Sequence, residues 1–282
     1  MVRSALDLPF RPVKPRATGI TMVIDNGLPT GGFRDHIAST APLIDVVKFG
    51  WGTVVATPDI GAKIAVLKEH GIDFFFGGTL FEKHVLQDRF DEYRAFCRAW
   101  GCRVVEISNG TVALSNEEKA RYVGKLAGEF TVFSEVGLKD TARSERMGTW
   151  DWVEYIRQDL EAGASLVIAE ARESGRSGIC HADGKLRSDV LDVILGSGAD
   201  VDRLLFEAPT KDLQASFIRR IGPNVNLGNV APADVIGVET LRLGLRSDTL
   251  TAALPPAVPR RAAALSARPS SNGRHLAAAP DF

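Results

Sequence analysis

Eight short apolar runs along this chain each end at a charged or amide residue. Continuous runs of Val, Ile, Leu and Phe are typical of parallel strands buried on both faces, and the spans between them are long enough for helices. Charges are costly to bury without partners, so their repeated placement at strand ends predicts a site there. The runs end at Asp25, Lys48, Glu82, Glu106, Glu135 with Lys139, Glu170 with Arg172, Glu207, and Asn226 with Asn229.

This alternation predicts an α/β fold, a single-domain (β/α)8 TIM barrel with its chemistry at the C-terminal ends of the strands. Eight units need roughly 250 residues, and the chain has 282. We expect a lead-in over residues 1–16, the barrel over 17–251, and a disordered tail rich in Ala, Pro and Arg over 252–282. A doubly wound open sheet is the alternative, although closure would remove exposed strand edges.

The composition narrows the class of protein. A hydrophobic content of 45% and a charged content of 24% are ordinary for a soluble globular protein, and the net charge of −1 argues against a surface for nucleic acid. We expect no signal peptide and no membrane span, because no apolar run reaches about 20 residues. The cysteines, which lack metal-ligand spacing, are predicted to be reduced thiols of a cytoplasmic protein: Cys97, Cys102 and Cys180.

Helix signals occupy the spans between the apolar runs. Ser115, followed by acidic residues, predicts a helix N-cap. A long helix is predicted from about Phe81 to Trp100, and another from Trp150 to Ala162. Trp150 and Trp152 either pack on the barrel or form part of a face through which two copies associate.

Four glutamates end successive strands and are predicted to point into one volume, because the ends of barrel strands form a ring. Like charges held close together repel unless a cation or protons neutralise them. Mg²⁺, which prefers hard oxygen ligands, is therefore the expected cofactor. The alternative is that some of these carboxylates form ion pairs with Lys48, Lys139 or Arg172. The predicted metal ligands are Glu106, Glu135, Glu170 and Glu207.

Lys48 is a cation inside the otherwise apolar run VVKFGWGT. A lysine in a buried strand faces the barrel interior or its rim. Burial would lower the pKa of its ammonium into the range useful for proton transfer, so Lys48 is a candidate general acid.

Several basic and amide residues are candidates for anion binding. Lys14 and Arg16 precede the first strand, and Arg172 ends the sixth. The segment GPNVNLGNV, over residues 222–230, is predicted to form a phosphate-binding loop, because barrels often bind phosphate after strands seven and eight. Its candidate contacts are Asn226, Gly228 and Asn229.

Taken together, the segments resemble the phosphosulfolactate synthase family of the coenzyme M pathway, which has plant relatives associated with heat stress. The resemblance runs from Lys14 to Leu250, in the family's order. It is carried by the segments KPRATGITMVID, VVKFGWGT, GGTLFE, VVEISNG, SEVGLKD, DLEAGASLVIAEARESG, LLFEAP, GPNVNLGNV and ETLRLGLRSDTL.

The resemblance implies a carbon–sulfur lyase that uses Mg²⁺ to add sulfite to phosphoenolpyruvate, giving (2R)-3-sulfolactate phosphate. Lys48 would be the general acid, with Lys139 the second choice and Arg172 a further catalytic cation. Where the family pattern reads EISDG this chain reads EISNG, with Asn109, which puts any metal-binding role of that position in doubt. The alternatives are another nucleophile acting on phosphoenolpyruvate, or a non-enzymatic stress-associated protein.

Overall fold

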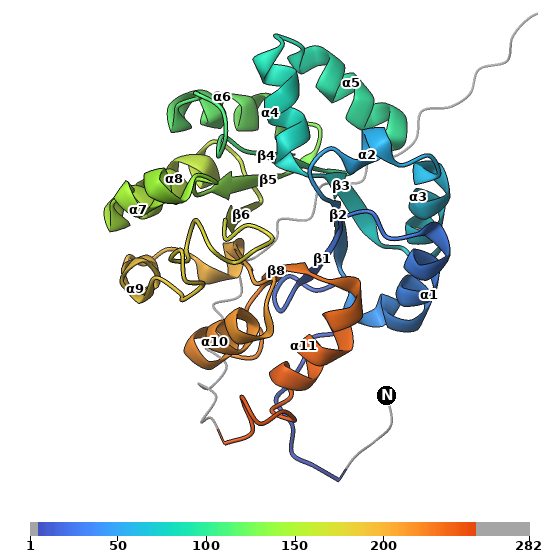
Figure 1. Cartoon of the computed structure of the whole chain (residues 1–282), viewed down its shortest axis with the longest axis vertical. Helices are drawn as coiled ribbons and strands as arrows, with labels where there is room; N and C mark the ends of the chain where they lie inside the picture. Colours follow the sequence, from blue (N-terminus) through green and yellow to red (C-terminus); the bar gives the residue numbers. More distant parts are fainter. Residues whose placement is uncertain (1–4, 252–282) are drawn as a thin grey trace, which may run out of the picture.

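A computed structural model describes residues 5–251, so the predicted tail at 252–282 lies outside the described residues. Eight parallel strands form a barrel with helices around it, which confirms the predicted fold (Figure 1). The strands are β1 (Thr21–Asp25), β2 (Val46–Phe49), β3 (Asp73–Phe76), β4 (Val104–Ile107), β5 (Thr131–Val136), β6 (Leu166–Ala169), β7 (Leu204–Glu207) and β8 (Leu227–Val230).

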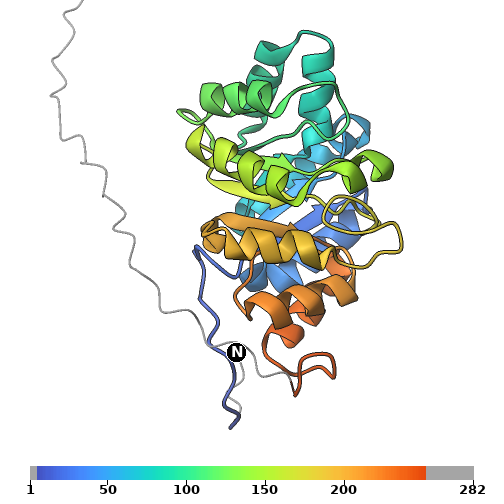
Figure 2. The same ribbon diagram turned by 90° about the vertical axis from the view of Figure 1, so that its left-hand side faces the viewer.

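The strand order distinguishes a barrel from an open sheet. The order is β3-β2-β1-β8-β7-β6-β5-β4, so the first strand pairs with the last, and β3 lies against β4 across the remaining seam. A doubly wound sheet would not pair its first and last strands in this way, so that alternative is excluded. The ring of helices and the enclosed strands are visible down the barrel in Figure 1 and from the side in Figure 2.

The helices follow the strands in the predicted alternation. Ser115 forms a capping box with Glu118, which confirms the predicted N-cap. The helices are α1 (Thr30–Thr40), α2 (Thr53–Ala56), α3 (Ile60–Glu69), α4 (Gly78–Leu86), α5 (Phe90–Trp100), α6 (Asn116–Leu126), α7 (Thr141–Arg146), α8 (Thr149–Glu161), α9 (Ser188–Gly196), α10 (Lys211–Ile221) and α11 (Val235–Arg242), with short 3₁₀ turns at Ala41–Leu43, Val201–Arg203 and Pro232–Asp234.

The prediction of one long helix from Phe81 to Trp100 is wrong. The chain leaves the helix at Gln87, passes through Asp88 at φ 56°, and begins α5 at Phe90. A positive φ is incompatible with a continuous right-handed helix. The apolar periodicity continues across the break because both helices cover the same side of the barrel, so the pattern alone did not reveal it.

Two apolar layers hold the barrel together. The larger lies between the strands and the helices, and the smaller fills the inside of the barrel with side chains that include Met22, Phe75 and Phe133. Trp152 is fully buried, so it packs within the fold, whereas Trp150 is 66% exposed. Of the two tryptophans, only Trp150 remains available to a second copy of the chain.

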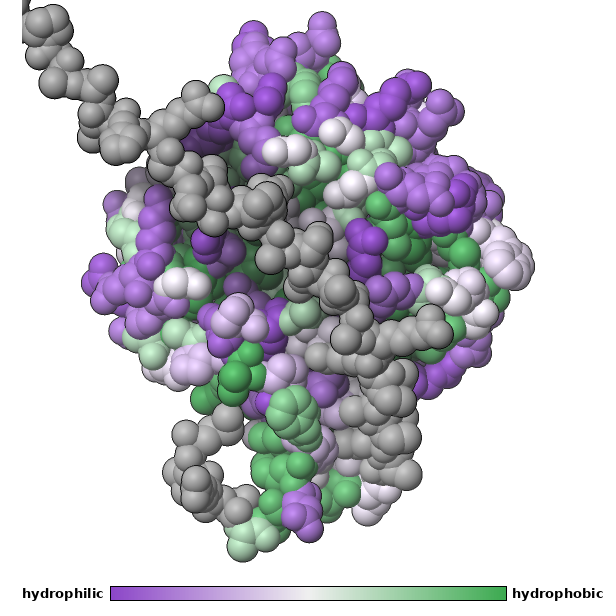
Figure 3. Space-filling model, turned by 180° about the vertical axis from the view of Figure 1, so that it is seen from behind, coloured by the Kyte–Doolittle hydropathy of each residue, from purple (hydrophilic) through white to green (hydrophobic). Residues whose placement is uncertain are grey.

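The face of the molecule opposite to that of Figure 1 is mixed in character. On the face opposite to Figure 1, hydrophilic and apolar residues are interspersed, with hydrophilic side chains gathered along the outer edge (Figure 3). Among residues 5–251, no helix combines the length and the apolar character that a membrane crossing needs.

Candidate active site

The charged residues of the site form the layer above the apolar filling of the barrel. In a strand, residues two apart point to the same face. Each site residue therefore follows an interior apolar residue by two positions, which directs its side chain into the barrel. The pairs are Val46 and Lys48, Val104 and Glu106, Phe133 and Glu135, Ile168 and Glu170, and Leu205 and Glu207.

The structure brings the four predicted glutamates together, all at 1% exposure or less. Lys48 Nζ lies 3.0 Å from Glu106, 3.2 Å from Glu207 and 3.5 Å from Glu135. Lys48 therefore faces the barrel interior, as predicted, and the carboxylates are both clustered and ion-paired.

Lys139 enters the same cluster from the loop after β5. Its Nζ lies 2.9 Å from Glu135, 3.5 Å from Glu170 and 3.6 Å from Glu82. The Lys139 side chain is 23% exposed and that of Lys48 is 7% exposed. Lys139 is thus the ammonium that a bound molecule reaches more easily.

Three of the carboxylates lie close enough together that they could share a cation. One oxygen each from Glu135, Glu170 and Glu207 can be chosen so that all three lie within 4.8 Å of one another. Oε2 of Glu170 is buried and accepts no hydrogen bond, which is costly for a buried oxygen, and Lys139 Nζ lies 3.5 Å from it. Glu207 is better satisfied, because Oε2 accepts the backbone N–H groups of Ala171 and Arg172.

The ionisation of these groups reflects an excess of negative charge. Burial, with Glu135 and Glu207 nearby, holds the pKa of Glu170 well above its ordinary value. Burial also raises the pKa of Glu106 to about 7, although Lys48 opposes the shift. Burial acts in the same direction on Glu135, but Lys139 and Lys48 outweigh it and hold its pKa below the ordinary range.

The expectation of a lowered lysine pKa is wrong for this site. Burial alone would lower the pKa of Lys48, but Glu106, Glu207 and Glu135 outweigh it and raise that pKa well above its ordinary value. The pKa of Lys139 is raised for the same reason. Because several carboxylates surround each ammonium, both lysines carry positive charge at neutral pH.

Two further predicted residues line the small cavity that lies among these charged groups. Arg172, with a φ of 62°, donates from Nη1 to the carbonyl of Lys139 and has a partly exposed side chain. Asn229 lies at the end of β8 and lines the cavity, and its Oδ1 is buried without a hydrogen-bond partner. Both remain candidates for substrate contacts.

Two predicted anion-binding residues, Lys14 and Arg16, lie at the opposite, N-terminal end of the barrel. Lys14 Nζ donates to the carbonyls of Ala41 and Ile44, and Arg16 pairs with Asp45, all of which precede β2. The N-terminal segment, dark blue in Figure 2, lies at the end of the barrel away from the yellow loop that follows β6. The prediction that Lys14 and Arg16 bind substrate is therefore wrong.

The predicted phosphate-binding loop is also corrected. Asn226 lies before β8, where Oδ1 accepts the N–H of Ile20 and Nδ2 donates to the carbonyl of Leu204. At Gly228 an added Cβ would lie 2.4 Å from Leu205 and 2.5 Å from Met22, so this glycine allows close packing inside the barrel. Only the Asn229 end of the segment reaches the site.

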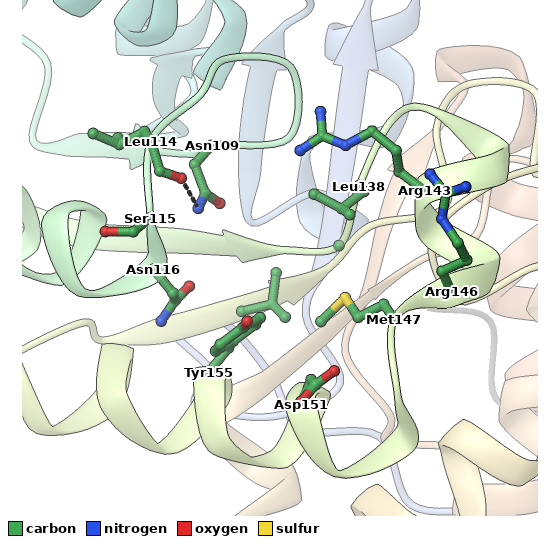
Figure 4. Close-up of a pocket in the computed structure, with 12 residues that line it drawn as sticks. Asn109, Leu114, Ser115, Asn116, Leu138, Arg143, Arg146, Met147, Asp151 and Tyr155 are labelled. Carbon is green, nitrogen blue, oxygen red and sulfur yellow. Dashed lines mark hydrogen bonds between the residues drawn. The ribbon is translucent and has the colours of Figure 1, made fainter.

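Asn109 lies outside the carboxylate cluster. Its Nδ2 donates to the carbonyl of Leu114, and it lines a separate pocket of about 340 Å³ between α6, α7 and α8. Figure 4 shows this pocket, with Arg143 and Arg146 of α7 on one side and Asn109 on the other. The change from Asp to Asn therefore leaves the three clustered carboxylates intact.

Glu82 is a residue of this cluster whose role the sequence did not predict. This residue lies in α4, is 2% exposed, and accepts hydrogen bonds from the loop after β4. The sequence shows Glu82 as the charge that ends the run FFFGGTLFE. Helix α4 begins within that run, at Gly78, so Glu82 lies on a helix and not at the end of a strand. The turn that brings α4 back over the strand ends is a tertiary feature.

Comparison with known proteins shows the family of this chain. The profile of the (2R)-phospho-3-sulfolactate synthase (ComA) family matches residues 9–248. The chain belongs to the phosphosulfolactate synthase family. It is 54% identical over 245 residues to the phosphosulfolactate synthase of Bacillus subtilis, an alignment that covers 87% of this chain and 97% of the relative.

More distant similarities extend the comparison. The protein HEAT-STRESS-ASSOCIATED 32 of Arabidopsis thaliana is 24% identical over 265 residues, covering 82% of this chain and 88% of the plant protein. The YdjI aldolase of Escherichia coli K12 aligns in structure with a TM-score of 0.51 and 12% identity, covering 84% of this chain and 94% of the aldolase. The likeness to the aldolase shows only that the two chains share the barrel fold.

Proposed function

We propose that this enzyme adds sulfite to phosphoenolpyruvate, in an Mg²⁺-dependent reaction, to give (2R)-3-sulfolactate phosphate. The observation that carries the proposal is the cluster of three buried carboxylates and two ammonium groups at the C-terminal end of the barrel. It occurs in a chain whose relative at 54% identity is a phosphosulfolactate synthase. Such a cluster suits a substrate that gains negative charge as it reacts.

The described residues fit a divalent cation. Glu135, Glu170 and Glu207 would hold it, because their oxygens converge and the buried Oε2 of Glu170 accepts no hydrogen bond, with Lys139 Nζ 3.5 Å away. When bound, Mg²⁺ would supply positive charge for the oxygens of the substrate carboxylate. Glu106 would remain the partner of Lys48, from which it lies 3.0 Å away.

The reaction requires charge stabilisation and one proton. The sulfur of sulfite attacks the methylene carbon of phosphoenolpyruvate, and the electrons of the carbon–carbon double bond move toward the carboxylate to form an enediolate. Lys48 and Lys139 supply fixed positive charge for that intermediate. Carbon two then takes a proton, for which the greater exposure of Lys139 favours it over Lys48.

The phosphate and sulfonate groups are assigned to the mouth of the site. Arg172 can bind an anion with a forked guanidinium, and Asn229 adds an amide. The central cavity measures about 30 Å³, which is close to the space of a single water. Side chains at the mouth, among them the 44% exposed Trp51, therefore move when substrate enters.

We place the enzyme in the cytoplasm. Cys97, Cys102 and Cys180 are all buried and unpaired, which suits a compartment that keeps thiols reduced. Association of copies through a face that contains Trp150 remains a prediction.

The test is phosphorus NMR of the purified protein with Mg²⁺, phosphoenolpyruvate and sulfite, with controls that omit sulfite or metal. We expect a new phosphate ester that forms only when both are present. Unchanged phosphoenolpyruvate that still raises the melting temperature would indicate another nucleophile, because a ligand specific to the native state stabilises it. If phosphoenolpyruvate neither reacts nor raises the melting temperature, the non-enzymatic alternative is favoured.

A further inference from the structure

Glu82 is a buried anion that joins two loops at the C-terminal end of the barrel. It belongs to α4, and its carboxylate reaches the loop between β4 and α6. Oε1 accepts hydrogen bonds from Ser108 Oγ at 2.5 Å and from the backbone N–H of Gly110 at 3.2 Å. Oε2 accepts hydrogen bonds from the backbone N–H groups of Thr111 at 2.9 Å and Val112 at 3.2 Å.

Three consecutive backbone N–H groups directed at one carboxylate form an anion nest. Hydrogen bonds to an ionised acceptor are roughly twice as strong as neutral ones. Glu82 therefore fixes the conformation of residues 110–112 by backbone contacts, whatever side chains those residues carry. This is a stronger constraint than packing alone gives to a loop that contains a glycine.

The same loop holds Lys139. The backbone N–H of Lys139 donates to the carbonyl of Gly110 at 3.2 Å, and an added Cβ at Gly110 would lie 3.2 Å from Lys139 Cγ. Lys139 Nζ is 3.6 Å from Glu82 Oε1. Glu82 thus contacts Lys139 both through its own charge and through the loop that it orders.

We propose that Glu82 is a positioning residue for Lys139, an inference that rests on the proposed role of Lys139 in the reaction. A lysine ammonium on a flexible four-carbon stem follows the carboxylates around it. Without Glu82, only Glu135 and Glu170 would attract Lys139 among the residues within 4 Å, and its ammonium would move toward them. Glu82 holds the ammonium on the side of the cavity toward the β4–α6 loop.

The first test is a double-mutant cycle of E82Q with K139M. Glutamine keeps the shape of the side chain but turns a donor toward the loop N–H groups. A misplacement of about 1 Å can cost about 10²-fold in turnover, so we expect E82Q to lower kcat by about that factor with KM within about twofold. In the K139M background the same change should lower kcat by less than about threefold, because the residue it positions is gone.

The control is E239Q at the other end of the barrel. Glu239 is also buried, and its carboxylate accepts hydrogen bonds from Nε and Nη2 of Arg11 at 3.0 and 3.1 Å. We expect E239Q to lower the melting temperature while kcat stays within about twofold of wild type. Equal losses of kcat from E82Q in both backgrounds, or wild-type kcat in E82Q alone, would overturn the proposal.

The second test needs no activity and separates this proposal from the proposed function. Backbone hydrogen exchange of E82Q should accelerate in peptides that cover residues 109–113 and 137–140, with other barrel peptides unchanged. Unchanged exchange at 137–140, or a uniform increase over the whole barrel, would overturn the positioning role. If wild type fails to react with phosphoenolpyruvate and sulfite, the proposed function fails, while the exchange result still decides whether Glu82 holds Lys139.

Discussion

The two ends of this barrel both bury charge but satisfy it differently. In the cluster at the C-terminal end, five carboxylates share two ammonium groups, and Oε2 of Glu106 and Oε2 of Glu170 have only a lysine ion pair and accept no hydrogen bond. At the N-terminal end, the basic side chains are bound to backbone carbonyls or paired with single carboxylates. Arg242 alone donates to the carbonyls of Ile20, Pro223 and Val225.

The difference separates charge that stabilises the fold from charge that serves a ligand. Buried polar groups are normally paired, so those of the N-terminal end need nothing further. Excess carboxylates repel one another and are retained at a cost in stability. The N-terminal end is thus structural, although Nε of Arg242 has no partner of its own.

The largest expected effect comes from changing Glu170, whose buried Oε2 accepts no hydrogen bond. Glu170→Gln removes a proposed metal ligand, so we expect kcat/KM to fall by about 10³-fold, or about 4 kcal/mol. The melting temperature in metal-free buffer should stay the same or rise, because a buried carboxyl crowded by Glu135 and Glu207 is replaced by a neutral amide. Steady-state kinetics measure kcat/KM and calorimetry measures the melting temperature. A large loss of stability in metal-free buffer would contradict the view that the carboxylates at the C-terminal end serve a ligand and not the fold.

The converse change is Arg242→Met at the other end. Loss of three hydrogen bonds from a charged donor, with buried carbonyls left behind, should lower the free energy of unfolding by about 3.5 kcal/mol. Turnover per folded molecule should remain near wild type. Denaturant unfolding and active-site titration would check this, and a specific loss of kcat would show that the two ends are coupled.

Glu106 gives the metal-free protein a pH-dependent stability. Its ordinary pKa is 4.5 and its folded pKa is about 7, so the folded state holds a proton that the unfolded chain has released. Stability is therefore lost as pH rises from 4.5 to 7, by about 3.5 kcal/mol at about 1.4 kcal/mol per pKa unit. Relative to wild type, the Glu106→Gln variant should gain up to that amount in free energy of unfolding as pH rises from 5 to 8, measured by urea unfolding. A difference between the two proteins that stays constant with pH would refute the prediction.

The smallest effect is expected for Lys14→Met. Lys14 Nζ donates to two carbonyls beneath β2, so its loss should cost about 1 kcal/mol in stability and leave the KM for phosphoenolpyruvate within about twofold. Arg172→Met, at the mouth of the site, should instead raise that KM. A raised KM in the Lys14 variant would return this residue to the substrate site.

Much of the fold could be predicted from the sequence. Alternation of apolar runs and amphipathic spans is enough for a barrel, and the charges that end β4 to β7 mark the site because strand ends meet in a ring. The inward position of Lys48 was predictable too, since a lysine inside a buried apolar strand must face the barrel interior or its rim. The break at Asp88 was not, because apolar periodicity can continue across two helices that cover one surface.

The sequence by itself determined which residues carry charge and which side of each strand they occupy. Only the tertiary structure decided at which end of the barrel a residue lies, as Asn226 and Asn229 show within a single segment. It also set the direction of the Lys48 pKa, and it brought Glu82 to Lys139 from a helix. The physical reason is that periodicity along a strand is local, whereas burial cost and charge balance depend on neighbours that are distant in sequence.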